Sequence, residues 1–172
     1  FFNSGLGRLT IPENVTVIGR KAFGSSRYLK NVIIEGNVTE IGYAAFYKTR
    51  ITSIKLPDSL ERIENSTFYG ATALSSVDFG KGVKEIGEYA FYGTGFRNIA
   101  IPENVETIES YAFANTNARS ITLRSSLKNI AEKSGEDGDY WGAVGTLHDI
   151  DYELYPDEHC TKAVDILKSE NV

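Results

Sequence analysis

Three residues in this chain have the chemistry to form a cysteine- or histidine-based catalytic site. His148, His159 and Cys160 are the two histidines and the single cysteine, so they are the candidates for a nucleophile with a neighbouring base. No glycine elbow and no patterned third partner accompany them. We therefore expect Cys160 to be a small buried residue on a helix face, and we predict no catalytic residue and no enzymatic activity.

Metal and cofactor sites are not expected either. Glu136, Asp137 and Asp139 could offer clustered carboxylate oxygens to calcium, a hard cation. The full EF-hand spacing is absent, so a solvated acidic loop is the favoured interpretation. A single cysteine allows neither an intrachain disulfide nor a cysteine metal cluster. The sequence thus predicts no metal and no cofactor.

Aromatic and glycosylation signals recur at a fixed spacing. Tyr47, Tyr69 and Tyr92 each follow a phenylalanine and are predicted to stack into an aromatic row. Packing over the edge of a core is the favoured interpretation, and a ligand-binding strip is the alternative. Asn14, Asn37 and Asn65 begin formal N-glycosylation sequons. Two of these sequons arise from the repeat itself, so they carry little information.

The spacing belongs to a repeat that runs through most of the chain. Phenylalanines recur at steps of 22 or 23 residues: Phe1, Phe23, Phe46, Phe68, Phe91 and Phe113. An isoleucine keeps the same steps: Ile18, Ile41, Ile63, Ile86, Ile108 and Ile130. A unit of this length cannot bury its own apolar face, so stacked copies are predicted to share one continuous core.

Each copy is expected to contain two strands and a turn. Period-2 alternation predicts a short strand at the start of each copy: Leu9, Val32, Ile54, Val77, Ile99 and Ile121. Pro12, Pro57 and Pro102 end three of these strands because proline removes a hydrogen-bond donor. The next run, such as 38–42, predicts a second, weaker strand on the opposite side. The turn after it, such as 43–46, could be a single helical or 3₁₀ turn.

The repeats divide the chain into two regions. A solenoid is predicted over 1–130, beginning with a truncated repeat at 1–8 whose front half we expect to lie outside this chain. Residues 131–172 are interpreted as a C-terminal cap, which open-ended solenoids require. The cap is expected to contain a loop, a strand over 148–155 and a short helix from about 156 to 169.

The amino-acid sequence of the repeat resembles that of a known family. The segments 11–23 (IPENVTVIGRKAF), 56–68 (LPDSLERIENSTF) and 101–113 (IPENVETIESYAF) closely resemble the BspA-like, or Treponema pallidum-type, leucine-rich repeat. Thr67 replaces the family's alanine and Gly80-Lys81 replaces its proline turn, which are conservative departures. The resemblance covers about 1–130 and implies a β-rich α/β solenoid, a right-handed superhelix with a parallel sheet and repeats of 22–23 residues.

Charge and hydropathy exclude two classes of partner. The net charge of -5 comes from interspersed lysines and acidic residues, whereas nucleic-acid binding requires a basic stripe. No apolar run approaches 18 residues, so this chain is not expected to insert into a membrane.

The outward side chains of the first strands are expected to form one contiguous face. Small polar side chains of mixed charge would make this face shallow and suited to a protein or glycan rather than to a metabolite. The alternative is that the face is merely a solvated surface. The side chains that compose it are Arg8, Thr10, Asn31, Ile33, Ser53, Lys55, Ser76, Asp78, Asn98, Ala100, Ser120 and Thr122.

The resemblance also implies a function. It implies a non-catalytic, adhesion-like interaction module of a cell-surface or secreted protein from a host-associated bacterium or protist. The expected partner is a protein or glycan ligand of the extracellular host matrix or of other cells. The alternative is a rigid spacer that displays a domain absent from this chain, and a hydrolase built from the cap is a more distant one.

Overall fold

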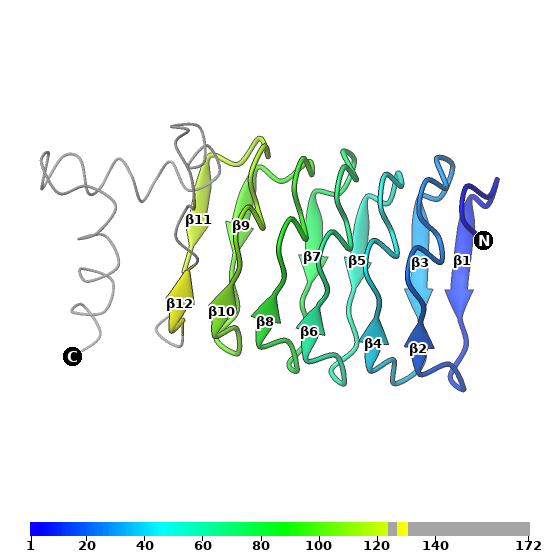
Figure 1. Cartoon of the computed structure of the whole chain (residues 1–172), viewed down its shortest axis with the longest axis horizontal. Coiled ribbons are helices and arrows are strands. Elements are labelled where there is room, and N and C mark those ends of the chain that lie inside the picture. The colour runs from blue at the N-terminus through cyan, green and yellow to red at the C-terminus, as the bar shows by residue number, and fades with distance from the viewer. Residues whose placement is uncertain (124–126, 131–172) are drawn as a thin grey trace, which may run out of the picture.

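The computed structural model shows a parallel β-solenoid in which successive coils stack side by side along the long axis (Figure 1). The structure describes residues 1–123 and 127–130. These residues form twelve strands and no helix, and none of them belongs to a helix that could span a membrane. The predicted stack of parallel strands is therefore confirmed, and the helical part of the α/β expectation is not.

One row of strands contains the first strand of each copy. Its members are β1 (Arg8–Ile11), β3 (Asn31–Ile34), β5 (Ser53–Lys55), β7 (Ser76–Asp78), β9 (Asn98–Ala100) and β11 (Ser120–Thr122). The row consists of a β1-β3-β5-β7 sheet and a β11-β9 sheet, and all of its pairings are parallel. Residues at equivalent positions of adjacent copies pair, as Arg8 does with Asn31.

A second row of two-residue strands lies beside the first (Figure 1). Its members are β2 (Val17–Ile18), β4 (Glu40–Ile41), β6 (Arg62–Ile63), β8 (Glu85–Ile86), β10 (Thr107–Ile108) and β12 (Asn129–Ile130). They pair in parallel as β12-β10-β8-β6 and β2-β4. The expected second, weaker strand is therefore confirmed.

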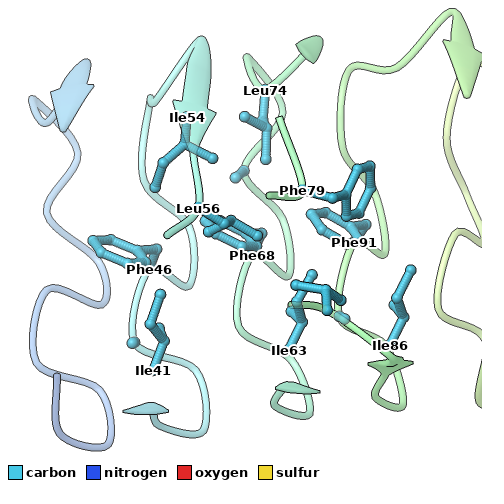
Figure 2. Packing of buried hydrophobic residues seen from close by; sticks show 14 of the residues in the cluster. Ile41, Phe46, Ile54, Leu56, Ile63, Phe68, Leu74, Phe79, Ile86 and Phe91 are labelled. Carbon is cyan, nitrogen blue, oxygen red and sulfur yellow. The ribbon is translucent and has the colours of Figure 1, made fainter. Parts of the chain in front are cut away.

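A column of phenylalanine rings lies between the two rows of strands. Figure 2 shows Phe46, Phe68 and Phe91 in line, with an isoleucine of the second strand beside each ring. The rings from Phe1 to Phe113 stack with centroids 5.2–5.7 Å apart and planes within 12° of each other. Phe23 to Phe113 are buried, whereas Phe1, the first ring of the column, is 81% exposed. The shared apolar interior is therefore present.

The turn around each phenylalanine differs from the helical turn that the sequence suggested. Among the described residues, nine non-glycine residues have φ between 51° and 59°, and each lies two positions before or after a phenylalanine of the column. A turn with left-handed backbone on both sides of its phenylalanine, as at Ala44 and Lys48, cannot be a right-handed helix. The segment instead forms successive β-turns, such as the one closed by the Ala45 N–H donating to the Gly42 carbonyl oxygen at 3.1 Å.

Main-chain hydrogen bonds to the neighbouring coil stabilise these turns. The N–H groups of Phe46 and Phe68 donate to the carbonyl oxygens of Thr67 and Ala90 in the following coil, at 3.0 and 2.8 Å. The Ser66 N–H likewise donates to the Glu88 carbonyl oxygen at 2.8 Å. A left-handed residue outside glycine costs of order 1 kcal/mol, and these bonds offset that cost.

A network around Arg62 links three successive coils. Its guanidinium pairs with Glu85 of the next coil and with Glu109 of the coil after that, the latter at 2.9 Å, and also with Glu64 at 3.4 Å. The same group donates to the Asn65 side-chain oxygen at 3.2 Å. Hydrogen bonding to Glu85 raises the pKa of Arg62, and the guanidinium lowers the pKa of the Glu85 carboxyl.

Several sequence expectations lie outside the described residues. These are the cap over 131–172 with its strand and helix, and the side chains of Glu136, Asp137, Asp139, His148, His159 and Cys160. The division into solenoid and cap therefore stays a prediction.

The phenylalanine column generates the first prediction. Replacing Phe68, which is fully buried, with alanine should lower the free energy of unfolding by about 3–5 kcal/mol, because it leaves a cavity between two stacked rings. Phe1→Ala is the matched control because this ring belongs to the same column but is 81% exposed, and it should cost less than about 1 kcal/mol. Urea denaturation measures both values, and equal losses would contradict a shared core.

The Arg62 network generates the second prediction. Arg62→Met should lower the free energy of unfolding by roughly 1–2 kcal/mol at pH 7, because it leaves three half-buried carboxylates without their cation. The pKa of Glu85 is depressed below its ordinary 4.5, so its contribution is present above that value. It is lost as the pH falls through the lower pKa of the folded state.

The difference between wild type and Arg62→Met should therefore shrink as the pH falls below 4.5, the ordinary pKa of the Glu85 carboxyl. Lys84→Met is the control, because Lys84 forms an exposed pair with Glu61 at 3.7 Å, and it should change stability by less than about 0.5 kcal/mol at any pH. A constant Arg62→Met effect across the pH range would show that the side chain acts through packing rather than charge.

Candidate binding face

The structure places the twelve side chains of the expected face on the first row of strands. Eleven of them are exposed and Ser120 is half-buried. Strand pairing aligns them into columns, since Ser53 pairs with Ser76, and Lys55 pairs with Asp78. On the β9–β11 pair, Asn98 aligns with Ser120. We call this surface the strand face.

A shallow hollow lies at the β1 end of the strand face. It has a volume of about 420 Å³ and is lined by Arg8, Leu9, Thr10, Asn31, Val32, Ile33 and Ser53. Ile33 is 57% exposed there, an apolar side chain among polar neighbours. An exposed apolar group beside hydrogen-bonding groups is the mixture that protein interfaces use.

The electrostatics of the strand face are mild. Lys55 Nζ lies 3.8 Å from Asp78 Oδ2, and both side chains are largely exposed. Ser120 Oγ donates to Asn98 Oδ1 at 2.8 Å. An exposed pair of this kind contributes at most about 1 kcal/mol, so either charge can turn to a partner at little cost.

The polar side chains of the strand face carry hydroxyl, amide and charged groups. The strand face has serine and threonine hydroxyls without a histidine or cysteine beside them, and both histidines and the cysteine lie beyond the described residues. Within 1–123 and 127–130, no cluster of three histidine, cysteine, aspartate or glutamate side chains could hold a metal ion.

The aromatic row that the sequence predicted is present on the turns. Tyr47, Tyr69 and Tyr92 stack with ring centroids 5.6 and 4.8 Å apart. The sequence analysis missed Tyr89 and Tyr111, which stack at 4.9 Å beside this row. Their signal was available, because each lies two residues before a phenylalanine of the column, 22 residues apart.

The sequence analysis also missed the Arg62 network. Glu85 follows Arg62 by one period and pairs with it across β6 and β8, so comparison of equivalent positions could have found this contact. Asn65, the third sequon asparagine, is drawn into the same network: its side-chain oxygen accepts hydrogen bonds from Arg62 and from the Glu88 N–H at 3.2 Å.

Comparison with known proteins identifies the repeat. The profile of the BspA type Leucine rich repeat region, in six copies, matches residues 1–95 and 65–135. No curated protein sequence matches the chain.

Two solved structures share the fold. A leucine-rich repeat protein from Bacteroides ovatus is 30% identical, with a TM-score of 0.66, and the match covers 73% of this chain and 33% of that one. The pneumococcal vaccine antigen PcpA is 27% identical, with a TM-score of 0.58, over 74% of this chain and 31% of that one. The chain thus spans about a third of the length of either protein. With the profile matched over most of its length, the chain belongs to the BspA-type leucine-rich repeat family.

Proposed function

We propose that this chain is a non-catalytic interaction module whose strand face binds a protein, or a glycan, outside the cell. One observation carries the proposal: twelve side chains from six coils lie along the first row of strands, eleven of them exposed, and strand register aligns them into columns within the β1–β7 sheet and the β9–β11 sheet. Such a surface can be varied one side chain at a time without disturbing the buried phenylalanines behind it.

The dimensions of the strand face suit a macromolecular partner. Parallel strands lie about 4.8 Å apart, so six coils extend over roughly 24 Å. A stable protein interface buries about 800 Å² on each partner, which a surface of this length can supply with adjoining turns. The small hydroxyl and amide side chains contribute little each, so the binding energy would be distributed over several coils.

The comparisons support a place at the cell surface. PcpA is described as a vaccine antigen of pneumococcus, and this chain resembles it in fold and in 27% of aligned residues. By extension of that likeness, we propose for the present chain an adhesion-like role in attachment to host matrix or other cells. Localisation at the cell surface or in the extracellular medium follows from the same proposal.

A rigid spacer is the second candidate function. The continuous phenylalanine column and the main-chain bonds between coils favour it, because they resist bending at any single joint. In that case the strand face would be a solvated surface, and another part of a longer protein would make the contact.

A triple substitution separates the two candidates. Asn31→Ala, Lys55→Ala and Asp78→Ala together should weaken attachment to immobilised collagen, laminin or intact epithelial cells by about tenfold or more, since each lost contact is worth roughly 0.5–1 kcal/mol. Biolayer interferometry measures the first two and flow cytometry the third.

The matched control removes one asparagine, one lysine and one acidic residue from the turns beyond the first strands. Asn37, Lys81 and Glu13 are exposed there, and their replacement by alanine should leave attachment within about twofold of wild type. Attachment that survives the strand-face triple variant would favour the spacer.

A further inference from the structure

Four tyrosines form an angular notch on the turns, away from the strand face. Tyr69 and Tyr92 stack with planes 10° apart, and Tyr89 and Tyr111 stack with planes 2° apart. The two pairs meet at an angle, since Tyr89 and Tyr92 contact edge to face at 63°. Together with Ser66 they line a hollow of about 440 Å³, which we call the tyrosine notch.

The register of the coils explains the hollow. Tyr89 and Tyr111 lie two positions before their phenylalanines, and Ser66 holds that position one coil earlier. Its small side chain leaves the space in front of Tyr69 that a third tyrosine of the column would fill. The notch is therefore a step between two aromatic columns offset by one coil.

The neighbouring coils already place cations on tyrosine rings. Lys48 Nζ lies 4.9 Å from the ring centroid of Tyr47, and the Arg20 guanidinium lies 4.7 Å from that of Tyr43. In the next two coils, the position of Lys48 is occupied by Gly70 and Gly93. Within the described part of the chain, no lysine or arginine lies over the rings of Tyr69, Tyr89 or Tyr92.

An acidic residue lies beside the notch. Glu88 precedes Tyr89, and its negative charge acts on the Tyr89 phenol. The Glu88 N–H donates to Glu109 Oε2 at 2.9 Å, so a second carboxylate lies next to Glu88. Burial, and then the charge of Glu88, raise the pKa of the Tyr89 phenol, so the ring stays neutral at physiological pH.

We propose that the tyrosine notch binds a lysine or arginine side chain from a basic segment of a partner protein. Aromatic faces attract cations through their quadrupole, and the carboxylate of Glu88 beside Tyr89 adds a further attraction for a positive charge. The same carboxylate would repel an anionic ligand, and a neutral sugar would gain nothing from its charge. Charge complementarity therefore selects the cation.

The notch is a second surface, independent of the strand face. Its lining shares no residue with the strand face, so the two can be tested separately. Loss of attachment in the Asn31, Lys55 and Asp78 triple variant would say nothing about cation binding at the notch. A notch that binds no cation would leave the strand-face proposal intact.

The first test compares two peptides on the full chain. One alternates arginine with glycine, and the other replaces each arginine with citrulline, which has nearly the same shape without the charge. We expect isothermal titration calorimetry at low salt to show binding of the arginine peptide at least tenfold tighter than that of the citrulline peptide. Equal affinities, or no binding of either peptide, would overturn the proposal.

A pair of substitutions at one glycine tests the location. Gly93→Lys gives this coil a cation at the position that Lys48 holds two coils earlier. The new lysine side chain should occupy the notch and weaken binding of the arginine peptide about tenfold. Gly93 has φ +65° and its added Cβ would meet atoms no nearer than 3.8 Å. Lys48 and Asn115 hold the equivalent position with φ 51° and 54°, so both side chains are compatible with this backbone.

Gly93→Asn is the matched control, because it adds a side chain at the same left-handed position without the charge. It should leave the affinity within about threefold of wild type, and thermal melting verifies that both variants fold. If Gly93→Lys does not fold, Tyr69→Leu against Tyr69→Phe replaces it, and only the leucine variant should lose binding. If Gly93→Lys or Tyr69→Leu binds the arginine peptide with wild-type affinity, the peptide binds elsewhere and the proposed site is wrong.

Discussion

Two parallel devices hold the coils at a common spacing: the hydrogen bonds from each turn to the next coil, and the column of phenyl rings beside them. Hydrogen-bonded parallel strands set a spacing of about 4.8 Å, whereas the ring centroids lie 5.2–5.7 Å apart. The rings therefore stack with a lateral offset, the arrangement that aromatic pairs prefer. Because this spacing is fixed, any side chain that recurs at one position becomes part of a column on the surface.

The features that repeat were predictable from the sequence for this reason. The phenylalanine and isoleucine columns, both rows of strands and the exposed side chains of the strand face all follow from one period and the alternation of a strand. The alternation of its strand placed Ile33 on that face, and the structure shows it exposed at the hollow near β1. The stacking of Tyr47, Tyr69 and Tyr92 follows from the same reasoning.

Features stabilised by contacts between coils were harder to predict. Ala44 and Tyr89 have left-handed backbone although neither residue favours it locally, and the N–H of each donates to a carbonyl oxygen in the adjacent coil. Local propensity therefore suggested a helical turn where β-turns form. The Arg62 network was missed because its residues differ from copy to copy, so they do not form a recurring column in the sequence.

The strand face and the tyrosine notch show how such a fold separates stability from recognition. Glycines at 70 and 93 remove side chains next to Tyr69 and Tyr92 while the phenylalanines behind them keep their stacking. The phenylalanine column contributes no side chain to either surface.

The main-chain bonds of the phenylalanine turns run in one direction, since the N–H groups of Phe23, Phe46, Phe68 and Phe91 each donate to the coil that follows. Bonds at other turns run the opposite way, as the Lys84 N–H donates to the Glu61 carbonyl oxygen of the preceding coil. The stack of coils therefore has a direction, and its two ends are structurally different. Gene duplication can lengthen it only in whole units joined head to tail, and a partial unit would shift every column out of line. Evolution can thus adjust the reach of such a molecule in discrete steps of about 5 Å while leaving the joint between units unaltered.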